Sequence, residues 1–523
     1  MARRNRKFIV GALAALTLAG CTSGPATPKP TDTRTPISGV NGKPSASPVT
    51  GPLNPSAWVP CPDQATEVLG HAVNGYSLDC ASIAVPQDWN HKDDGKTFTL
   101  SLIRARSDKQ SNRIGSLVVN PGGPGASGVQ LAVALTQQLP AAITQRFDIV
   151  GFDPRGVGQS TEIKCLDPTT EDESFAAIPD PISQSDFDAA VAITKKLVGP
   201  CGTKYGAQLP LFSTEQAARD MDAIRVAVGD DKLTYLGYSY GTLLGAVYAQ
   251  LFPTHIRHMV LDGAEDPKQD PVAHAFSQAG GFELAFDDFS KWCRATPNQC
   301  PLPDEAHTYL SFIMNLETGA PSVGVDGRKA TTGWVMTAVA SAMYTERYWP
   351  VLAKALVNLQ AGDPTLMFAL ADAYAERDAT GHYSNLFDAN EAVNCADYSS
   401  NPTIDQIRQY QGEWRAKYPT FGGQMAVGML GCAQGVWPGK PDPFPTGPAK
   451  GAPPIVVVGT TGDPATPYAQ TAKLATMLGV GHVLTWDGEG HTAYPQTTCI
   501  SNAVDAYLID GTVPPTGTTC PKS

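Results

Sequence analysis

Positive charge is scarce in this chain. Its 523 residues include 38 Lys and Arg against 50 Asp and Glu, which gives a formal net charge of −12. No run of basic residues follows the first seven positions. A protein that binds phosphate backbones needs a basic face, so the composition argues against a nucleic-acid partner.

Metal-binding cysteine motifs are also missing. None of the 11 Cys forms a C-x-x-C pair, and no group of Cys and His has the spacing of a zinc site. We therefore expect no metal.

The N-terminus carries a short apolar run over residues 8–19, preceded by four basic residues. The run is too short to span a bilayer comfortably and is typical of a signal peptide. It ends in Leu18-Ala19-Gly20-Cys21, which resembles a bacterial lipobox. We expect a signal peptide over 1–20 and a lipid on Cys21 that anchors an exported protein to the outer face of the cell membrane, with partial release as an option. The alternative is an ordinary signal peptide with a chance Cys.

Pro, Ser, Thr and Gly dominate the next segment, residues 21–55, which predicts a disordered tether. The ten Cys beyond Cys21 are an even number, as expected for disulfides in an exported chain. The simplest pairing joins neighbours along the chain, and the alternative is that some are buried free thiols. These ten are Cys61, Cys80, Cys165, Cys201, Cys293, Cys300, Cys395, Cys432, Cys499 and Cys520.

Short apolar runs alternate with helical patterns on either side of a long central stretch. This alternation predicts an α/β protein with a mostly parallel sheet and helices on both faces. The stretch over 264–450 has helical pieces but few strand candidates, and we expect it to be an inserted helical cap. The sheet domain then comprises 56–263 and 451–523. Predicted strands lie at 98–103, 116–119, 147–152, 233–237, 259–261, 455–458 and 483–486, and predicted helices at 128–138, 214–228, 241–250 and 467–478.

A G-x-S-x-G motif is centred on Ser239, between a predicted strand and a predicted helix. This is the setting in which a serine nucleophile sits on a sharp strand-to-helix turn. A serine hydroxyl needs a base, which in turn is oriented by an acid.

The base and the acid should follow the serine along the chain. His491 lies in a glycine-rich loop after the last predicted strand, whereas His482 opens that strand, so His491 is the favoured base. Asp463 directly follows the buried run at 455–459 and is the favoured acid. Its rival Asp487 precedes His491 by too few residues.

The tetrahedral intermediate of acyl transfer needs two backbone donors. One should be the amide of Tyr240, the residue after the nucleophile. The other should come from the glycine loop Asn120-Pro121-Gly122-Gly123-Pro124-Gly125, where we favour Gly123 over Gly122.

That glycine loop resembles the HGGPG segment of proline iminopeptidases, with Asn in place of His. The run Asp153-Pro154-Arg155-Gly156-Val157-Gly158-Gln159-Ser160 resembles the D-x-R-G-x-G-x-S loop of the same group. Together with the serine, Asp463 and His491 motifs, the chain from about residue 56 onward is similar to exported tripeptidyl aminopeptidases of actinobacteria and their mycobacterial lipoprotein relatives. The resemblance implies the α/β-hydrolase fold, a helical cap over the active site and no cofactor. Asp153 and Arg155 are interpreted as bracing residues.

The resemblance also implies that acidic cap residues hold the free amine of a peptide substrate. Glu391 and Asp397 are the first candidates, and Glu265 and Asp266 come next, with solvated surface acids or helix caps as the alternative. Thr466 is expected to line the pocket, to hydrogen-bond near Asp463 or to cap the following helix.

The function predicted from these motifs is a serine hydrolase that trims peptides from the N-terminus. The alternative is a carboxylesterase or lipase with the same residues. A non-catalytic binding protein is a remote third possibility, since such proteins usually lose one of the three residues.

Overall fold

A computed structural model of the chain describes residues 57–61 and 73–522. The predicted signal peptide, the lipid anchor at Cys21 and nearly all of the tether lie outside the described residues. Among the helices that the structure describes, none combines the length and the apolar composition needed to cross a membrane.

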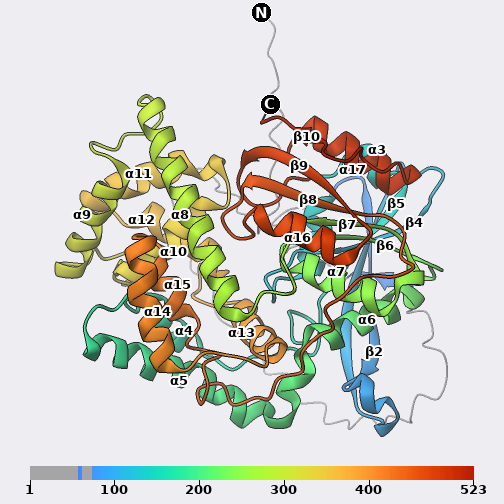
Figure 1. Cartoon of the computed structure of the whole chain (residues 1–523), viewed down its shortest axis with the longest axis horizontal. Coiled ribbons are helices and arrows are strands. Elements are labelled where there is room, and N and C mark those ends of the chain that lie inside the picture. Colours follow the sequence, from blue (N-terminus) through green and yellow to red (C-terminus); the bar gives the residue numbers. More distant parts are fainter. Residues whose placement is uncertain (1–56, 62–72, 523) are drawn as a thin grey trace, which may run out of the picture.

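Ten strands of the described residues form one sheet, which fills one half of the molecule (Figure 1). Their spatial order is β1-β2-β3-β5-β4-β6-β7-β8-β9-β10. The pairings from β1 to β5 in this order are antiparallel, and all the pairings from β5 to β10 are parallel. The strands are β1 (Val59–Pro60), β2 (Tyr76–Pro86), β3 (Thr97–Ser107), β4 (Gly115–Asn120), β5 (Phe147–Phe152), β6 (Leu233–Tyr238), β7 (Ile256–Asp262), β8 (Ile455–Gly462), β9 (Gly481–Glu489) and β10 (Thr519–Cys520).

The mostly parallel sheet predicted from the sequence is confirmed, and every predicted strand lies inside an observed one. The central strands β4, β5 and β6 are buried along their whole length, so their apolar runs were easy to recognise. The sequence did not reveal β2, which pairs antiparallel with β3 and has only partial burial. A half-exposed strand with polar residues lacks the continuous apolar run of a central strand.

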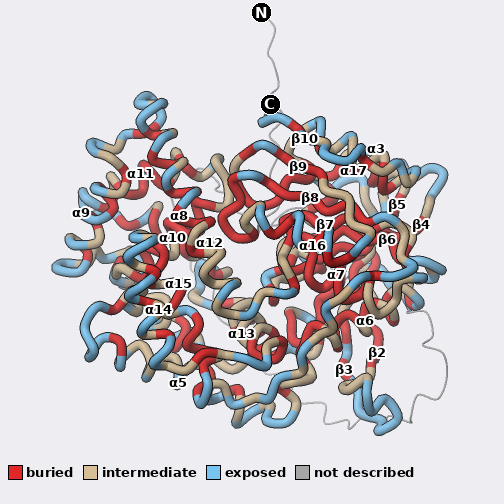
Figure 2. Tube along the Cα trace, in the orientation of Figure 1, coloured by how far each residue is buried: buried red, intermediate tan, exposed pale blue. Residues whose placement is uncertain are grey.

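Helices cover both faces of the sheet. Side chains alternate along β4, so that Val118 packs into one apolar core, whereas Leu117 and Val119 pack into the other. The first core is closed by α6 (Thr214–Val228), α7 (Tyr240–Leu251) and α16 (Ala469–Leu478). The second is closed by α2 (Gly128–Leu135), α3 (Ala141–Thr144) and α17 (Thr498–Asp510). Figure 2 shows the central strands as buried segments between these helices.

A second, helical body lies beside the sheet, between β7 and β8 in the sequence (Figure 1). It has its own apolar core, which includes Trp334 and Trp349. We call this body the cap. Its helices are α8 (Pro271–Ala295), α9 (Ala306–Gly319), α10 (Thr332–Met343), α11 (Trp349–Gln360), α12 (Thr365–Ala375), α13 (Leu386–Asp397), α14 (Ile404–Lys417) and α15 (Gly422–Gly428).

An earlier segment also packs against the cap, which the sequence did not indicate. The helices α4 (Pro168–Ala176) and α5 (Gln184–Tyr205) precede α6 in the chain. Phe175 of α4 stacks on Trp334 of the cap with ring centroids 5.2 Å apart. The cap together with α4 and α5 forms one helical layer, which is therefore built from two separate pieces of the chain.

Five disulfides confirm the expectation for the cysteines. Each bond joins neighbours along the chain, as the simplest pairing predicted, and none of the ten remains a free thiol. The pairs are Cys61–Cys80, Cys165–Cys201, Cys293–Cys300, Cys395–Cys432 and Cys499–Cys520.

Candidate active site

Ser239 stands alone between β6 and α7 in a backbone conformation that side chains rarely adopt. Its φ is 55° and its ψ is −128°, and such strain is typical of a residue held in place for function. The flanking glycines are required by space, because a Cβ on Gly237 would lie 2.3 Å from the carbonyl oxygen of Gly241. The strand, the turn and the helix thus expose the serine at the carboxyl edge of the sheet.

Asp463 and His491 are in direct contact. Nδ1 of His491 lies 2.9 Å from both carboxylate oxygens of Asp463, and both side chains are buried. Burial by itself lowers the pKa of His491, but the charge and hydrogen bond of Asp463 outweigh it, so the pKa is raised. This pair has the geometry of an acid that orients an imidazole base.

The imidazole also lies beside the chain that holds the serine. The backbone amide of Ser239 donates to the carbonyl oxygen of Asp262 at 2.9 Å. The next residue is Gly263, where an added Cβ would lie 3.1 Å from Cε1 of His491. Cε1 lies between the two ring nitrogens, so this contact places the imidazole beside the end of β7, which holds the serine turn.

The cap contacts the same histidine. The amide of His491 donates to the carbonyl oxygen of Tyr344 at 2.9 Å, and the two rings meet edge to face with centroids 5.4 Å apart. A Cβ on Gly490 would lie 2.8 Å from that same carbonyl oxygen, so only glycine allows this approach.

The rival residues lie elsewhere. Asp487 is exposed and accepts a hydrogen bond from Thr461. His482 pairs with Val456 inside the sheet. Neither forms a hydrogen bond or an ion pair with His491.

The glycine loop after β4 distinguishes its two candidate donors. The amide of Gly122 donates to Oδ1 of Asn120 at 2.9 Å, so it is already used. The amides of Gly123 and Tyr240 have no acceptor among the described residues. A Cβ on Gly122 would lie 2.9 Å from the nitrogen of Tyr240, so the loop and the serine turn are adjacent. Two free donors are therefore available for an oxyanion.

Thr466 supports Asp463. Its hydroxyl donates to Oδ2 of Asp463 at 3.0 Å, and its amide donates to Oδ1 at 2.9 Å. The hydroxyl also lies 3.4 Å from Nδ1 of His491. The N-cap of α16 is Tyr468, so Thr466 braces the acid and does not cap the helix.

The two first candidates for binding a substrate amine differ in what they contact. Asp397 accepts hydrogen bonds from the amide of Thr214 at 2.7 Å and from its hydroxyl at 2.6 Å. Its carboxylate is therefore occupied by the first residue of α6. Glu391 places Oε1 3.7 Å and 3.8 Å from the sulfurs of the Cys395–Cys432 disulfide. Burial raises the pKa of Asp397 to about 8 and that of Glu391 to about 7.

Glu265, one of the second candidates, has no such partner. The described residues give its carboxylate no hydrogen bond and no ion pair, although it keeps some accessible surface. Burial raises its pKa to about 7, the charge of His491 lowers it and the charge of Asp463 raises it. Glu265 is therefore close enough to the histidine and its acid for their charges to interact. Its neighbour Asp266 lies 3.7 Å from Lys473.

Asp153 and Arg155 hold loops together, as interpreted from the sequence. Arg155 is fully buried and binds both oxygens of Asp220 at 2.7 Å. Asp153 accepts from the hydroxyl of Ser127 at 2.6 Å. Neither forms a hydrogen bond with the serine or the histidine.

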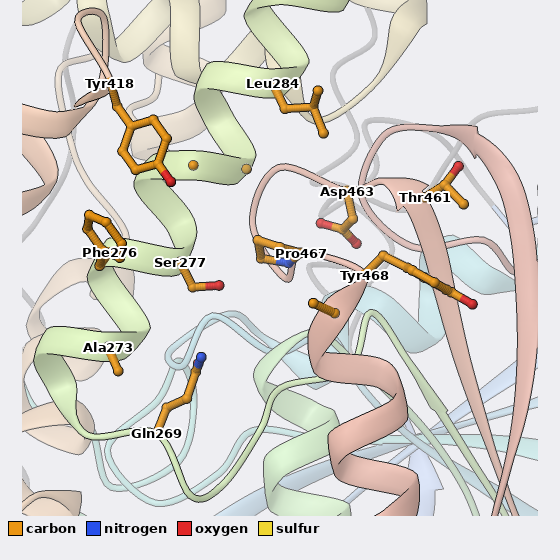
Figure 3. Close-up of a pocket in the computed structure, with 13 residues that line it drawn as sticks. Gln269, Ala273, Phe276, Ser277, Leu284, Tyr418, Thr461, Asp463, Pro467 and Tyr468 are labelled. Carbon is orange, nitrogen blue, oxygen red and sulfur yellow. The ribbon is translucent and has the colours of Figure 1, made fainter. Parts of the chain in front are cut away.

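A groove of about 570 Å³ lies between the cap and the loop that carries Asp463. Figure 3 shows Gln269, Ser277 and Tyr418 on the cap side and Asp463 opposite them. Helix α8 therefore stands across the groove from the acid.

Two groups of Cys and acidic residues in the described part lie close enough to hold a metal ion, but each contains a disulfide. Bonded sulfurs are not thiolates, and the thiolate is the form of Cys that binds metals. These groups therefore do not make metal sites.

The arrangement around Ser239 is typical of an α/β-hydrolase site. It combines a serine on a strained strand-to-helix turn with a buried pair of carboxylate and imidazole and with two free amides. Residues 115–312 match the family model described as alpha/beta hydrolase fold, and residues 418–520 match the model described as TAP-like protein. The fold class predicted from the sequence is thus confirmed.

The chain belongs to a family of actinobacterial serine hydrolases, and this confirms the predicted resemblance. It is 39% identical to Serine protease Hip1 of Mycobacterium tuberculosis, over 89% of this chain and 91% of the relative. It is 36% identical to Carboxylesterase B of the same species, over 93% of this chain and 94% of the relative. It is 32% identical to Tripeptidyl aminopeptidase of Streptomyces lividans, over 85% of this chain and 83% of the relative. The chain is therefore a serine hydrolase.

Proposed function

We propose that the chain is an exported serine peptidase that cleaves peptides from the N-terminus through an acyl-enzyme on Ser239. The observation that carries the mechanism is the 2.9 Å contact between His491 and Asp463 beside the strained serine turn. Relatives named as a serine protease and a tripeptidyl aminopeptidase support the choice of peptides.

The reaction proceeds in two halves. The hydroxyl oxygen of Ser239 attacks the scissile carbonyl carbon while its proton passes to Nε2 of His491. The amides of Gly123 and Tyr240 donate to the resulting oxyanion. Collapse breaks the C–N bond, and the leaving amine takes the proton from His491. Water then attacks the ester with His491 again as base, which releases the acid product and restores the serine.

Glu265 binds the free amine of the substrate in this proposal. A partly desolvated ammonium group needs a carboxylate partner, and the carboxylate of Glu265 has none within the described residues. Asp397 is already bonded to Thr214. Glu265, which the sequence ranked behind Glu391 and Asp397, therefore becomes the first candidate, and Glu391 follows it.

Labelling with a fluorophosphonate probe tests the nucleophile. The wild-type chain should label, Ser239→Ala should not, and Ser501→Ala on the outer helix α17 should label at the wild-type rate. Equal labelling of Ser239→Ala and wild type would reject the assignment. No labelling of any variant would favour the non-catalytic binding protein.

Paired substrates test amine recognition. A tripeptidyl amide with a free N-terminus should be cleaved faster than its N-acetylated form. Glu265→Gln should remove this preference by raising KM for the free peptide, and Asp266→Asn is the matched control that should keep it. An unchanged preference in Glu265→Gln would rule out Glu265.

Ester hydrolysis is the second candidate function, because a relative of similar identity is named Carboxylesterase B. The same residues cleave esters. Equal turnover of free and blocked peptides, together with faster turnover of acyl esters, would favour this function.

The proposed location rests on the sequence, with a lipid on Cys21 after removal of residues 1–20. Five disulfides support an oxidising compartment outside the cytoplasm. Cells fed a palmitate analogue should label the wild-type protein but not Cys21→Ser. Equal labelling of the two would reject the anchor.

A further inference from the structure

We propose that Asp262 is a positioning residue that fixes His491 relative to Ser239. The inference rests on the proposed function, in which these two residues react together. Asp262 is the last residue of β7 and is completely buried. The sequence motifs give it no role.

The main chain of Asp262 holds the serine turn. Its carbonyl oxygen accepts the amide of Ser239 at 2.9 Å, and Tyr238, the residue before the serine, pairs with Asp262 in the sheet. The end of β7 and the serine turn are thus one hydrogen-bonded unit.

The side chain of the same residue holds the histidine loop. Both carboxylate oxygens lie 3.0 Å from the amide of Ala493, and Oδ2 accepts the amide of Tyr494 at 2.7 Å. These amides belong to the second and third residues after His491. Hydrogen bonds from amides to a carboxylate are stronger than those to a neutral oxygen.

The loop needs such a restraint. Thr492, between His491 and these amides, has a φ of 66°, a conformation that costs a branched residue free energy unless its surroundings impose it. Its hydroxyl is buried without a hydrogen-bond partner. The carboxylate of Asp262 binds the amides of the two residues that follow Thr492, so it restrains the strained turn just after His491.

Asp262 therefore links the two reacting groups through one residue, because its main chain accepts the amide of the nucleophile and its side chain accepts two amides of the loop that carries the base. A displacement of reacting groups by about 1 Å can reduce the rate 100-fold. Asp463 fixes the ring of His491 on its Nδ1 side, whereas Asp262 fixes the backbone from which the ring projects.

Asp262→Asn tests this role, because it keeps the volume but sets an NH₂ group against an amide donor. We expect kcat and the rate of fluorophosphonate labelling to fall about 10- to 100-fold, with KM within about twofold. The control is Asp148→Asn, another buried carboxylate on a central strand, which binds Gln110 and Arg113 at the opposite edge of the sheet. It should lower the melting temperature but leave kcat unchanged.

Three results would overturn the proposal: a kcat of Asp262→Asn within twofold of wild type, an effect confined to KM, or an equal loss of kcat in Asp148→Asn. If Asp262→Asn does not fold, hydrogen exchange of the wild-type chain decides. The amides of Ala493 and Tyr494 should exchange as slowly as those of β7, and exchange at the rate of an exposed loop would reject the role. A wild-type chain without Ser239-dependent labelling would instead reject the proposed function, and the exchange measurement would still test the restraint.

Discussion

The hydroxyl of Thr466 provides a sharp test of how the acid is held. Thr466→Val replaces the hydroxyl by a methyl group of similar size. The side chain is buried, and its hydroxyl donates to Oδ2 of Asp463 at 3.0 Å. The substitution therefore removes one hydrogen bond to a charged group and leaves the shape of the site nearly unchanged.

The size of the effect follows from that bond. A hydrogen bond to a charged group contributes about 1.5 to 3 kcal/mol, which corresponds to about 10- to 150-fold in a rate constant if it is expressed fully in the transition state. Asp463 still accepts the amides of Ala465 and Thr466 at 3.0 Å and 2.9 Å. Because these two hydrogen bonds still hold the acid, we expect kcat/KM to fall about tenfold, near the lower end of that range.

The assay is steady-state hydrolysis of a chromogenic tripeptidyl amide, together with the labelling rate of the serine. Thr471→Val is the matched control, because its hydroxyl is also buried but has no hydrogen-bond partner. This control should keep its activity and be as stable as wild type or more so. A kcat/KM for Thr466→Val within about twofold of Thr471→Val would refute the reasoning.

Two further predictions concern stability. Six buried or half-buried acids have pKa values of about 7 to 8 in the folded chain, above their ordinary values of 3.8 or 4.5: Glu171, Asp262, Glu265, Glu391, Asp397 and Glu489. At pH values between the ordinary and the raised pKa, the folded state therefore binds more protons than the unfolded state. Stability should then fall as the pH rises from 5 to 8, which thermal scans at several pH values would measure. His274, with a pKa lowered to about 4, acts in the opposite sense below pH 6.5. A melting temperature that rises steadily from pH 5 to 8 would contradict the assignment of these acids. The second prediction is that removing Cys395–Cys432, which closes 37 residues, should destabilise the chain more than removing Cys293–Cys300, which closes 7. The expected losses in the free energy of unfolding are about 4 and about 2 kcal/mol. Chemical denaturation of the two double-alanine variants measures them, and a larger loss for the Cys293–Cys300 variant would contradict the prediction.

Local sequence patterns were enough to predict the central strands of the sheet and the order of the candidate site residues along the chain. Strands β4 to β6 are continuous apolar runs because both faces are covered, so they were visible without any structure. The same holds for Ser239, whose flanking glycines and neighbouring strand and helix are contiguous in the sequence. Asp463 and His491 followed from chain order, because catalytic groups gather after strands at the carboxyl edge of a parallel sheet.

Other features depend on packing between distant segments. The sequence did not show that α4 and α5 join the helical layer, because the contact of Phe175 with Trp334 links residues far apart in the chain. It did not show β2, whose partial burial depends on the antiparallel pairing with β3.

The roles of the acidic residues show this limit most clearly. The sequence ranked Asp397 ahead of Glu265, but Asp397 is bonded to Thr214 whereas Glu265 has no partner within the described residues. Asp262 reads as the end of a strand, and only the folded chain brings it to the histidine loop. The sequence by itself determined which groups are the candidates for the chemistry, because each of them lies in a local motif. The tertiary structure decided which carboxylates remain free and which hold the site together, because a buried charge is defined by the partners that the fold brings to it.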